Sequence, residues 1–206
     1  MRERPILFSA PMVRAILDGR KTQTRRVVKP FPDLVTDDGV PARFTPRDAE
    51  LGRLGAVITC PHGQPGDRLW VRETWAHVPS TAYRCSTGVQ QIDDPTSPGM
   101  AAVYAADWER SAPGRWRPSI HMPRWACRLL LEVTAVRAER LQDISDDDAR
   151  SEGCVGGHGS IPGYGYSATA GEHFAHVWRE LYGDDSWTAN PWVWVIDFKR
   201  EVVAHG

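Results

Sequence analysis

The sequence predicts an α+β fold organised around a small, mostly antiparallel β-barrel, with short flanking helices and long loops. Three observations support this class. Short strand-like segments outnumber helical ones, helices do not alternate regularly with strands, and stretches rich in glycine and proline separate the elements. Regular alternation would favour parallel crossover units, so we expect a largely antiparallel arrangement. The 206 residues, 41% of them hydrophobic, suffice for one sizeable core, and we expect a single domain.

The chain is expected to begin with a strand and a short helix. Pro5 to Phe8 is a short apolar run that predicts the strand. Ser9 can cap the helix, and Pro11 falls in its first turn, where a missing N–H costs nothing. Apolar residues then recur at helical spacing until Gly19, which suits a left-handed position after the last turn. The helix should therefore span residues 10 to 18.

The stretch L-D-G-R-K-T-Q-T-R-R, residues 17–26, concentrates cations and hydroxyls at a helix-to-strand turn. Residues three apart in a regular strand point to opposite faces, so Lys21 and Thr24 can share a pocket only if Lys21 belongs to the turn. The order of residues is not that of a phosphate-binding P-loop, because no glycine stands upstream of G-R-K-T. The remaining cations form either a nucleic-acid contact or a solvated basic face, and Arg20 and Arg25 are the better placed for phosphates or solvent. These cations are Arg20, Arg25 and Arg26.

A second strand is expected from Arg68 to Trp75, after a tight turn at Gly66. Alternation places Glu73 on the more apolar face of this strand, in the register of Leu69, Val71 and Trp75. A buried carboxylate must be protonated, hydrogen-bonded or paired with a cation. Glu73 is therefore a candidate site residue, with a structural ion pair or a solvent-facing position as the alternatives.

The middle of the chain is expected to be mostly irregular. Residues 29–66 and 77–100 are predicted as long loops, the first with a short strand at 56–59, and a short strand at 101–106 carries Tyr104. Residues 108–127 interleave aromatic and basic side chains, which can stack bases and hold phosphates or can cover the end of a barrel through Arg–Trp pairs. The residues of this region and its neighbours that we expect to contact a ligand are Trp75, Tyr104, His121, Arg124 and Trp125.

The C-terminal third has the longest strand pattern, at residues 128–144. Ser145 should cap a short helix whose first turn holds three aspartates, a placement that the helix dipole favours without any catalytic role. Residues 153–171 are predicted as a flexible glycine-rich loop, residues 172–182 as an amphipathic helix, and residues 192–199 as a central strand.

Composition limits the function classes. The net charge is −1 and the isoelectric point is near 6.7, so nucleic-acid binding would need a local basic patch. The four cysteines form no C-x-x-C pair, and the C-P-H sequence at 60–62 lacks a partner half for a metal site, so no metal or other cofactor is expected. No apolar run approaches the roughly 20 residues that span a bilayer, and the opening residues do not resemble a signal peptide. We expect a soluble cytoplasmic protein with no membrane partner.

Two motifs together resemble those of the ASCH-domain proteins, a branch of the PUA-like barrel superfamily. The first is G-x-K-x-x-T-x-R, formed by Gly19, Lys21, Thr24 and Arg26. The second is G-D-x-L-x-V-x-E, formed by Gly66, Asp67, Leu69, Val71 and Glu73. The chain is most similar to the longer ASCH-type proteins of bacteriophages and prophages. Relative to the small members of the family, residues 30–60, 77–126 and 153–171 would be insertions in a single domain.

The resemblance implies a cleft for RNA, DNA or a modified nucleoside. Some small ASCH proteins hydrolyse 4-acetylcytidine through a lysine, a threonine and a glutamate, which correspond to Lys21, Thr24 and Glu73. Thr24 could supply a nucleophile, while either Lys21 or Glu73 could act as the base. The alternatives are a non-catalytic reader of RNA or modified DNA, and a ribonuclease that uses Lys21 and His121. The resemblance leaves the choice between an amidohydrolase and a binding protein open.

Overall fold

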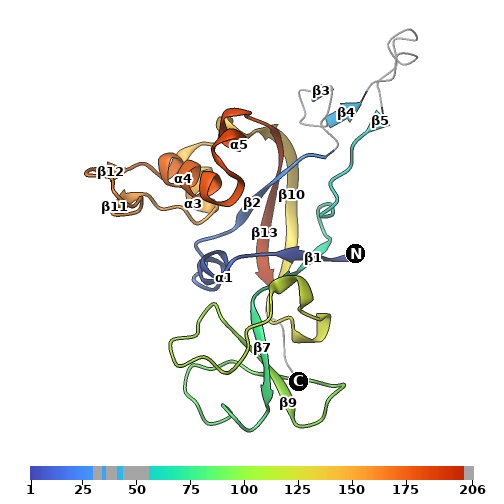
Figure 1. Cartoon of the computed structure of the whole chain (residues 1–206). Helices are drawn as coiled ribbons and strands as arrows, with labels where there is room; N and C mark the ends of the chain where they lie inside the picture. Colours follow the sequence, from blue (N-terminus) through green and yellow to red (C-terminus); the bar gives the residue numbers. More distant parts are fainter. Residues whose placement is uncertain (30–33, 36–40, 44–55, 202–206) are drawn as a thin grey trace. The chain divides into compact units, whose positions relative to one another are not determined.

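The computed structural model describes residues 1–29, 34–35, 41–43 and 56–201 (Figure 1). These residues form two compact units. The first unit takes the described parts of Met1–Gly19, Asp67–Glu132 and Arg200–Gly206, and the second takes those of Arg20–Gly66 and Val133–Lys199. The structure is mixed α and β with mostly antiparallel strand pairs, as the sequence predicts.

The first unit contains helix α1 and several short strands. Its elements are β1 (Glu3–Leu7), α1 (Ala10–Leu17), β6 (Arg68–Arg72), β7 (Trp75–Pro79), β8 (Ile92–Asp93), β9 (Met100–Tyr104), 3-10 turns at Ser119–His121 and Arg124–Ala126, and the start of β10 (Leu130–Arg140). β6 pairs with β1 in parallel and with β10 antiparallel, so the pair β1–β6 is a parallel exception in a largely antiparallel arrangement. A separate antiparallel sheet has the order β7-β9-β8.

The second unit carries most of the helices. Its elements are β2 (Gln23–Val27), β3 (Leu34–Val35), β4 (Pro41–Arg43), β5 (Ala56–Val57), the rest of β10, a 3-10 turn at Leu141–Asp143, α3 (Asp146–Ser151), β11 (Gly157–His158), β12 (Ser167–Ala168), α4 (Ala170–Tyr182), α5 (Asp184–Thr188) and most of β13 (Trp192–Glu201). Figure 1 shows β13 between β10 and β2, which confirms its predicted central position.

The described strands do not close into the expected barrel. The order of the five-stranded sheet is β1-β6-β10-β13-β2, with β1 and β2 as its two end strands. Most of the predicted insertion at residues 30–60 lies outside the described residues, and its described part includes the small antiparallel sheet β3-β4-β5. The long loops therefore contain short strands of their own.

Local sequence signals explain the helix boundaries. α1 follows Ser9 and ends before Gly19, whose φ of +74° is the left-handed value that glycine adopts without strain. α3 follows Ser145, whose side chain accepts a hydrogen bond from the backbone N–H of Asp148. α4 begins with a capping box between Thr169 and Glu172. These boundaries agree with the predicted ones to within about two residues.

The predicted strand at 68–75 is interrupted. β6 ends at Arg72 and β7 begins at Trp75, while the backbone N–H of Glu73 points at the sulfur of Met122, at 3.2 Å. The loop prediction for residues 77–100 is wrong at its start, because β7 continues to Pro79 and packs Ala76 and Val78 against Val103. A strand of five residues with an imidazole at its centre gives only a weak alternation signal.

The predicted loop at 153–171 contains the small hairpin of β11 and β12. Gly156 precedes this hairpin with a φ of +68°, and a Cβ placed there would lie 2.6 Å from the carbonyl oxygen of Ala168. Gly159 also has a positive φ, +76°, but a Cβ there would meet nothing within 4 Å. The two glycines therefore separate the cost of backbone conformation from the cost of a close approach.

We expect Gly156→Ala to destabilise the protein more than Gly159→Ala. Both variants bear the cost of a left-handed residue, about 1 to 2 kcal/mol. Gly156→Ala must also displace backbone atoms, which adds about 1 to 3 kcal/mol. Urea unfolding followed by circular dichroism measures both free energies. Equal losses in the two variants would show that the close approach at Gly156 carries no cost.

Candidate functional site

Lys21 lies in the connection between α1 and β2, before the strand begins, as a pocket shared with Thr24 requires. Its side chain is buried, with 2% of the residue exposed. The ammonium group donates to the carbonyl oxygen of Gln23 at 2.8 Å, to the carbonyl oxygen of Glu152 at 2.9 Å and to the Oε2 atom of Glu152 at 2.5 Å. An ammonium group has three N–H donors, so these acceptors match its full capacity.

Burial lowers the pKa of Lys21 below its ordinary value, and the neighbouring carboxylate of Glu152 opposes this shift. The partner of Lys21 within the second unit is thus Glu152, a residue that the sequence analysis did not single out. The sequence gives little indication of this role, because Glu152 directly follows α3 as the C-cap residue and belongs to no strand or helix pattern.

Arg25 is buried with Lys21, which corrects the expectation that it faces phosphates or solvent. Only 2% of Arg25 is exposed, and its guanidinium donates to the side chains of Glu139 and Gln23. Its Nη1 atom lies 3.6 Å from Oε1 of Glu152, so Lys21 and Arg25 share one carboxylate. A buried guanidinium needs such partners to offset its loss of hydration. Within residues 17–26, the prediction places Arg25 with Arg20 toward phosphates or solvent, whereas the structure buries Arg25 together with Lys21.

A network of charged groups surrounds this pair. Gln23 donates to Asp148 at 3.0 Å and to Asp197 at 2.7 Å. Arg137 forms ion pairs with Glu139, Asp148 and Asp197. Asp148 is one of the three aspartates in the first turn of α3, where the helix dipole favours them. It also contributes to this network, and its pKa is lowered although burial opposes the shift, because Gln23, Ser145 and the nearby arginines favour its charged form.

The other cations of residues 17–26 lie toward solvent. Arg20 is exposed and its Nη1 atom is 3.5 Å from the carbonyl oxygen of Gly153. Arg26 is half-buried and donates to the hydroxyl of Tyr182 at 3.3 Å. Thr24 is 1% exposed and pairs with Ile196 of β13. A side chain so fully buried needs a local opening before it can meet a substrate.

Glu73 is buried, as its register predicts, and it has a cation as partner. The residue is 1% exposed, and Arg128 donates to both of its carboxylate oxygens at 2.8 Å. Burial raises the pKa of Glu73, and the bonds from Arg128 oppose that shift. Arg128 also donates to both carboxylate oxygens of Asp107 and lies over the ring of Tyr104 at 4.2 Å. Burial by itself lowers the pKa of Arg128, but the carboxylates of Glu73 and Asp107 outweigh this effect and raise the pKa above its ordinary value.

The predicted catalytic residues are thus divided between the units. Lys21 and Thr24 belong to the second unit and Glu73 to the first. Each of the two charged residues has a partner within its own unit, Glu152 for Lys21 and Arg128 for Glu73. The grouping of the three as one catalytic site stays a prediction.

Aromatic and basic side chains gather in the first unit, where the sequence predicts them. Trp75 is buried and meets the half-buried Trp125 edge-on, with ring centroids 5.9 Å apart. His77 lies 6.0 Å from the Trp125 ring, and its Nε2 atom is 3.0 Å from a carboxylate oxygen of Asp94. Trp75 thus packs beneath the predicted aromatic and basic region, in a core cluster against which Trp125 is packed.

The ring of Trp70 has the guanidinium groups of two arginines near it. The guanidinium carbon of Arg72 lies 5.3 Å from the Trp70 ring centroid, and that of Arg124 lies 5.9 Å from it. Arg124 is exposed and also pairs with Glu3 at 2.9 Å, whereas Arg72 donates to the carbonyl oxygen of Ile120. We refer to Trp70, Arg72, Arg124 and Trp125 as the aromatic–basic surface.

The remaining predicted ligand contacts have different positions. Tyr104 is buried, and its hydroxyl donates to the carbonyl oxygen of Ala126 at 2.6 Å, so it supports the site from within. His121 is exposed at the end of the first 3-10 turn. Trp75 is likewise a core residue. His121, Arg124 and Trp125 are thus the predicted contacts of the first unit that reach its surface.

Comparison with protein-family models, with curated proteins and with solved structures finds no match. Within the described residues, no group of three or more histidine, cysteine, aspartate or glutamate side chains is arranged to hold a metal ion. No helix of the described chain is long and apolar enough to cross a membrane. The case for a function therefore depends on the geometry of the residues.

The partners that neutralise the buried charges are not evident from the sequence pattern. Besides Glu152 these are Glu139, Arg128 and Asp107. Arg128 has a usable signal, because it directly precedes the apolar run of β10 and so stands where a strand enters the core. The position of Trp70 could also be predicted from the sequence, because alternation places it beside Arg72 on the more polar face of β6.

We expect Arg128→Met to destabilise the protein by about 3 to 5 kcal/mol at neutral pH, because Glu73 is then a buried carboxylate without a cation. Without Arg128, burial raises the pKa of Glu73 still further. The folded state then binds a proton more tightly than the unfolded state, so the free energy of unfolding falls as the pH rises. The deficit relative to the unchanged protein should therefore be small near the ordinary pKa of glutamate and grow toward neutral pH.

Denaturant titrations between about pH 4 and pH 8 measure this deficit. The double variant Glu73→Gln, Arg128→Met is the control, because it has no carboxylate at this position and should lose most of the added pH dependence. A deficit of equal size in both variants at every pH would contradict the ion-pair explanation.

Proposed function

We propose that this chain binds single-stranded nucleic acid or an unpaired nucleobase through the aromatic–basic surface of the first unit. The observation that carries the proposal is the position of Trp70. The guanidinium carbons of Arg72 and Arg124 lie 5.3 Å and 5.9 Å from the centroid of its ring. Aromatic rings offer stacking to every base, and exposed guanidinium groups attract the phosphate backbone. The combination requires no particular base sequence.

The local structure suits such a surface. Trp125 follows Arg124 in a 3-10 turn that begins after Pro123, and its edge packs against Trp75. This packing limits the rotamers of Trp125, so less conformational freedom is lost when a base stacks on it. The tie between Arg124 and Glu3 is exposed, and such a pair contributes little to stability, so the guanidinium can turn to a phosphate at small cost.

The resemblance to ASCH-domain proteins supports the same class of ligand, because it implies a cleft for a nucleic acid or a modified base. The net charge of −1 is consistent with a local rather than a global attraction. We therefore expect modest affinity that depends strongly on salt, with RNA, DNA or a modified nucleoside as ligand.

Fluorescence anisotropy with labelled single-stranded oligonucleotides tests this proposal. Trp70→Ala should weaken binding by about 1 to 3 kcal/mol, the usual contribution of one stacked base. Arg124→Ala should weaken binding and reduce its dependence on salt concentration. Arg110→Ala is the matched control, because Arg110 is also an exposed arginine near a tryptophan ring of the first unit, 5.9 Å from that of Trp108.

The proposal is wrong if the intact protein does not bind any oligonucleotide at low salt. It is also wrong if binding persists unchanged in Trp70→Ala. Equal effects of Arg124→Ala and Arg110→Ala would indicate a diffuse attraction to cations rather than this surface.

A second candidate function is removal of an acyl group from an N-acylated cytosine, as the ASCH resemblance implies. The observation in its favour is the burial of Lys21, which lowers its pKa and so favours the neutral amine that a catalytic base requires. Its close contact with Glu152 acts in the opposite direction. Hydrolysis would add water across the amide bond, releasing acetate and leaving the amino group on the base.

If the chain is such an amidohydrolase, Lys21→Ala, Thr24→Ala and Glu73→Ala should each abolish acetate release from 4-acetylcytidine. Chromatography of the nucleoside products measures this directly. Circular dichroism of each variant is needed beside it, because all three residues are buried and their loss also affects folding. Full activity in Thr24→Ala would eliminate the assigned nucleophile, and a lack of turnover by the intact protein would eliminate this substrate.

A further inference from the structure

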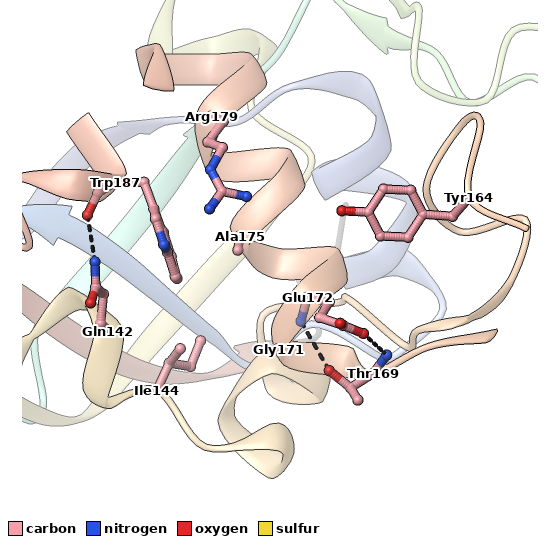
Figure 2. A pocket seen from close by; sticks show the side chains of 9 residues that line it. All are labelled: Gln142, Ile144, Tyr164, Thr169, Gly171, Glu172, Ala175, Arg179 and Trp187. Carbon is pink, nitrogen blue, oxygen red and sulfur yellow. Dashed lines mark hydrogen bonds between the residues drawn. The ribbon is translucent and has the colours of Figure 1, made fainter. Parts of the chain in front are cut away.

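The second unit has a surface groove of about 460 Å³ along helix α4 (Figure 2). Pockets of about 300 to 1,000 Å³ are the usual size for small-molecule sites. The side chains that matter for its chemistry are Gln142, Ile144, Tyr164, Glu172, Arg179 and Trp187. None of the residues that the sequence singles out as catalytic lines this groove, so its chemistry is independent of the proposed function.

Arg179 is the charged group of greatest interest in the groove. It is half-buried, and its guanidinium carbon lies 5.3 Å from the centroid of the Trp187 ring. Figure 2 shows the guanidinium directed along α4 toward Ala175, with the Trp187 ring beside it. Across the described part of the chain, the side chain of Arg179 has no hydrogen bond or ion pair. A half-buried guanidinium with unused donors favours an oxyanion, which can accept two parallel N–H bonds from it.

Another arginine of the same unit shows what a satisfied group looks like. Arg140 lies over Trp192 at 4.5 Å, and its Nη1 atom donates to the carbonyl oxygen of Asn190 at 3.1 Å. Both arginines contact an indole ring, but Arg140 also has a backbone acceptor. The unused donors of Arg179 are therefore not a general property of arginines beside tryptophan in this unit.

Two contacts fix the position of Trp187. Gln142 donates to the carbonyl oxygen of Trp187 at 2.8 Å, and the ring meets Phe174 edge-on with centroids 6.2 Å apart. Because the guanidinium already lies over the ring, binding a ligand costs less conformational freedom than it would with two mobile side chains.

The charges along α4 determine which end of the groove takes an anion. Glu172 precedes Arg179 by seven residues, or about 10 Å of helix rise. Its carboxylate accepts the backbone N–H of Thr169 in the capping box, so it is fixed at the start of the helix. An oxyanion is repelled at that end and attracted at the Arg179 end. Ile144 and the hydroxyl-bearing ring of Tyr164, which Figure 2 shows with its oxygen turned toward α4, offer contact to a flat organic body.

We propose that this groove binds a small planar organic anion, an aromatic ring that carries a phosphate or a carboxylate, with the anionic group on Arg179. The ring of the ligand lies along the groove against Ile144, which Figure 2 shows on the same side of α4 as Trp187. The fork of guanidinium donors supplies the selectivity for charge, and the flat walls supply the selectivity for shape.

Isothermal titration calorimetry on the full chain tests the proposal with four probes. AMP and benzoate represent the two kinds of planar anion, adenosine is a neutral ring, and inorganic phosphate is an anion without a ring. At least one planar anion should bind more tightly than both adenosine and phosphate. Arg179→Gln should weaken that binding about tenfold or more, as expected for loss of charge-assisted hydrogen bonds.

Two control variants locate the site. Arg140→Gln removes an arginine that also contacts a tryptophan, and it should leave the affinity for the planar anion unchanged. Trp70→Ala removes the centre of the aromatic–basic surface and reports any binding of the probes there. Failure of both AMP and benzoate to bind would overturn the proposal, and so would adenosine or phosphate binding as tightly as the tighter-binding of the two planar anions. Binding that is lost in Trp70→Ala but kept in Arg179→Gln would assign the ligand to the aromatic–basic surface instead and overturn the groove as its site.

Discussion

The burial of charge is the constraint on which both units depend. In the second unit Lys21 and Arg25 are sequestered around one carboxylate, Glu152, and in the first unit Glu73 is sequestered with Arg128. Removing such groups from water costs several kcal/mol each, and only well-placed partners return that energy. The partners come from distant parts of the sequence, so each pair joins elements that would otherwise be neighbours only through apolar contact. Stability by itself does not require this arrangement, since apolar residues of similar volume often serve as well.

Most of the helices and strands could be predicted from the sequence alone. Ser145, Gly19 and the apolar stripe of α4 act through neighbours within one or two turns, so they can be recognised without knowledge of the fold. The break at Glu73 could not be recognised, because the apolar alternation of residues 69–75 continues across it while the backbone leaves the ladder. The described strands also leave the sheet open, a property that depends on pairing between distant strands rather than on any local pattern.

The candidate site divides in the same way. Alternation correctly placed Glu73 in the core, because burial on a strand has a period of two residues. Its partner could not be derived, since Arg128 lies 55 residues away and no local rule links the two. Arg25 shows the opposite error. A run of cations suggests solvent or phosphate, yet the carboxylates Glu139 and Glu152 approach from β10 and from the end of α3, and they offset the cost of burial. Composition describes which charges a segment has, but the fold decides which of them are neutralised.

This distinction also separates structural charges from those available to a ligand. Lys21, Arg25 and Arg128 have buried head groups with carboxylates beside them, so a ligand anion would have to displace an existing partner. Arg124 has an exposed partner that water screens, and Arg179 has a tryptophan ring but no carboxylate among the described residues. Coulomb interactions weaken several-fold from a buried to a hydrated setting, so the donors of Arg124 and Arg179 can be redirected at low cost. For this reason the binding proposals rest on Arg124 and Arg179, although the densest run of cations in the sequence lies at residues 20–29.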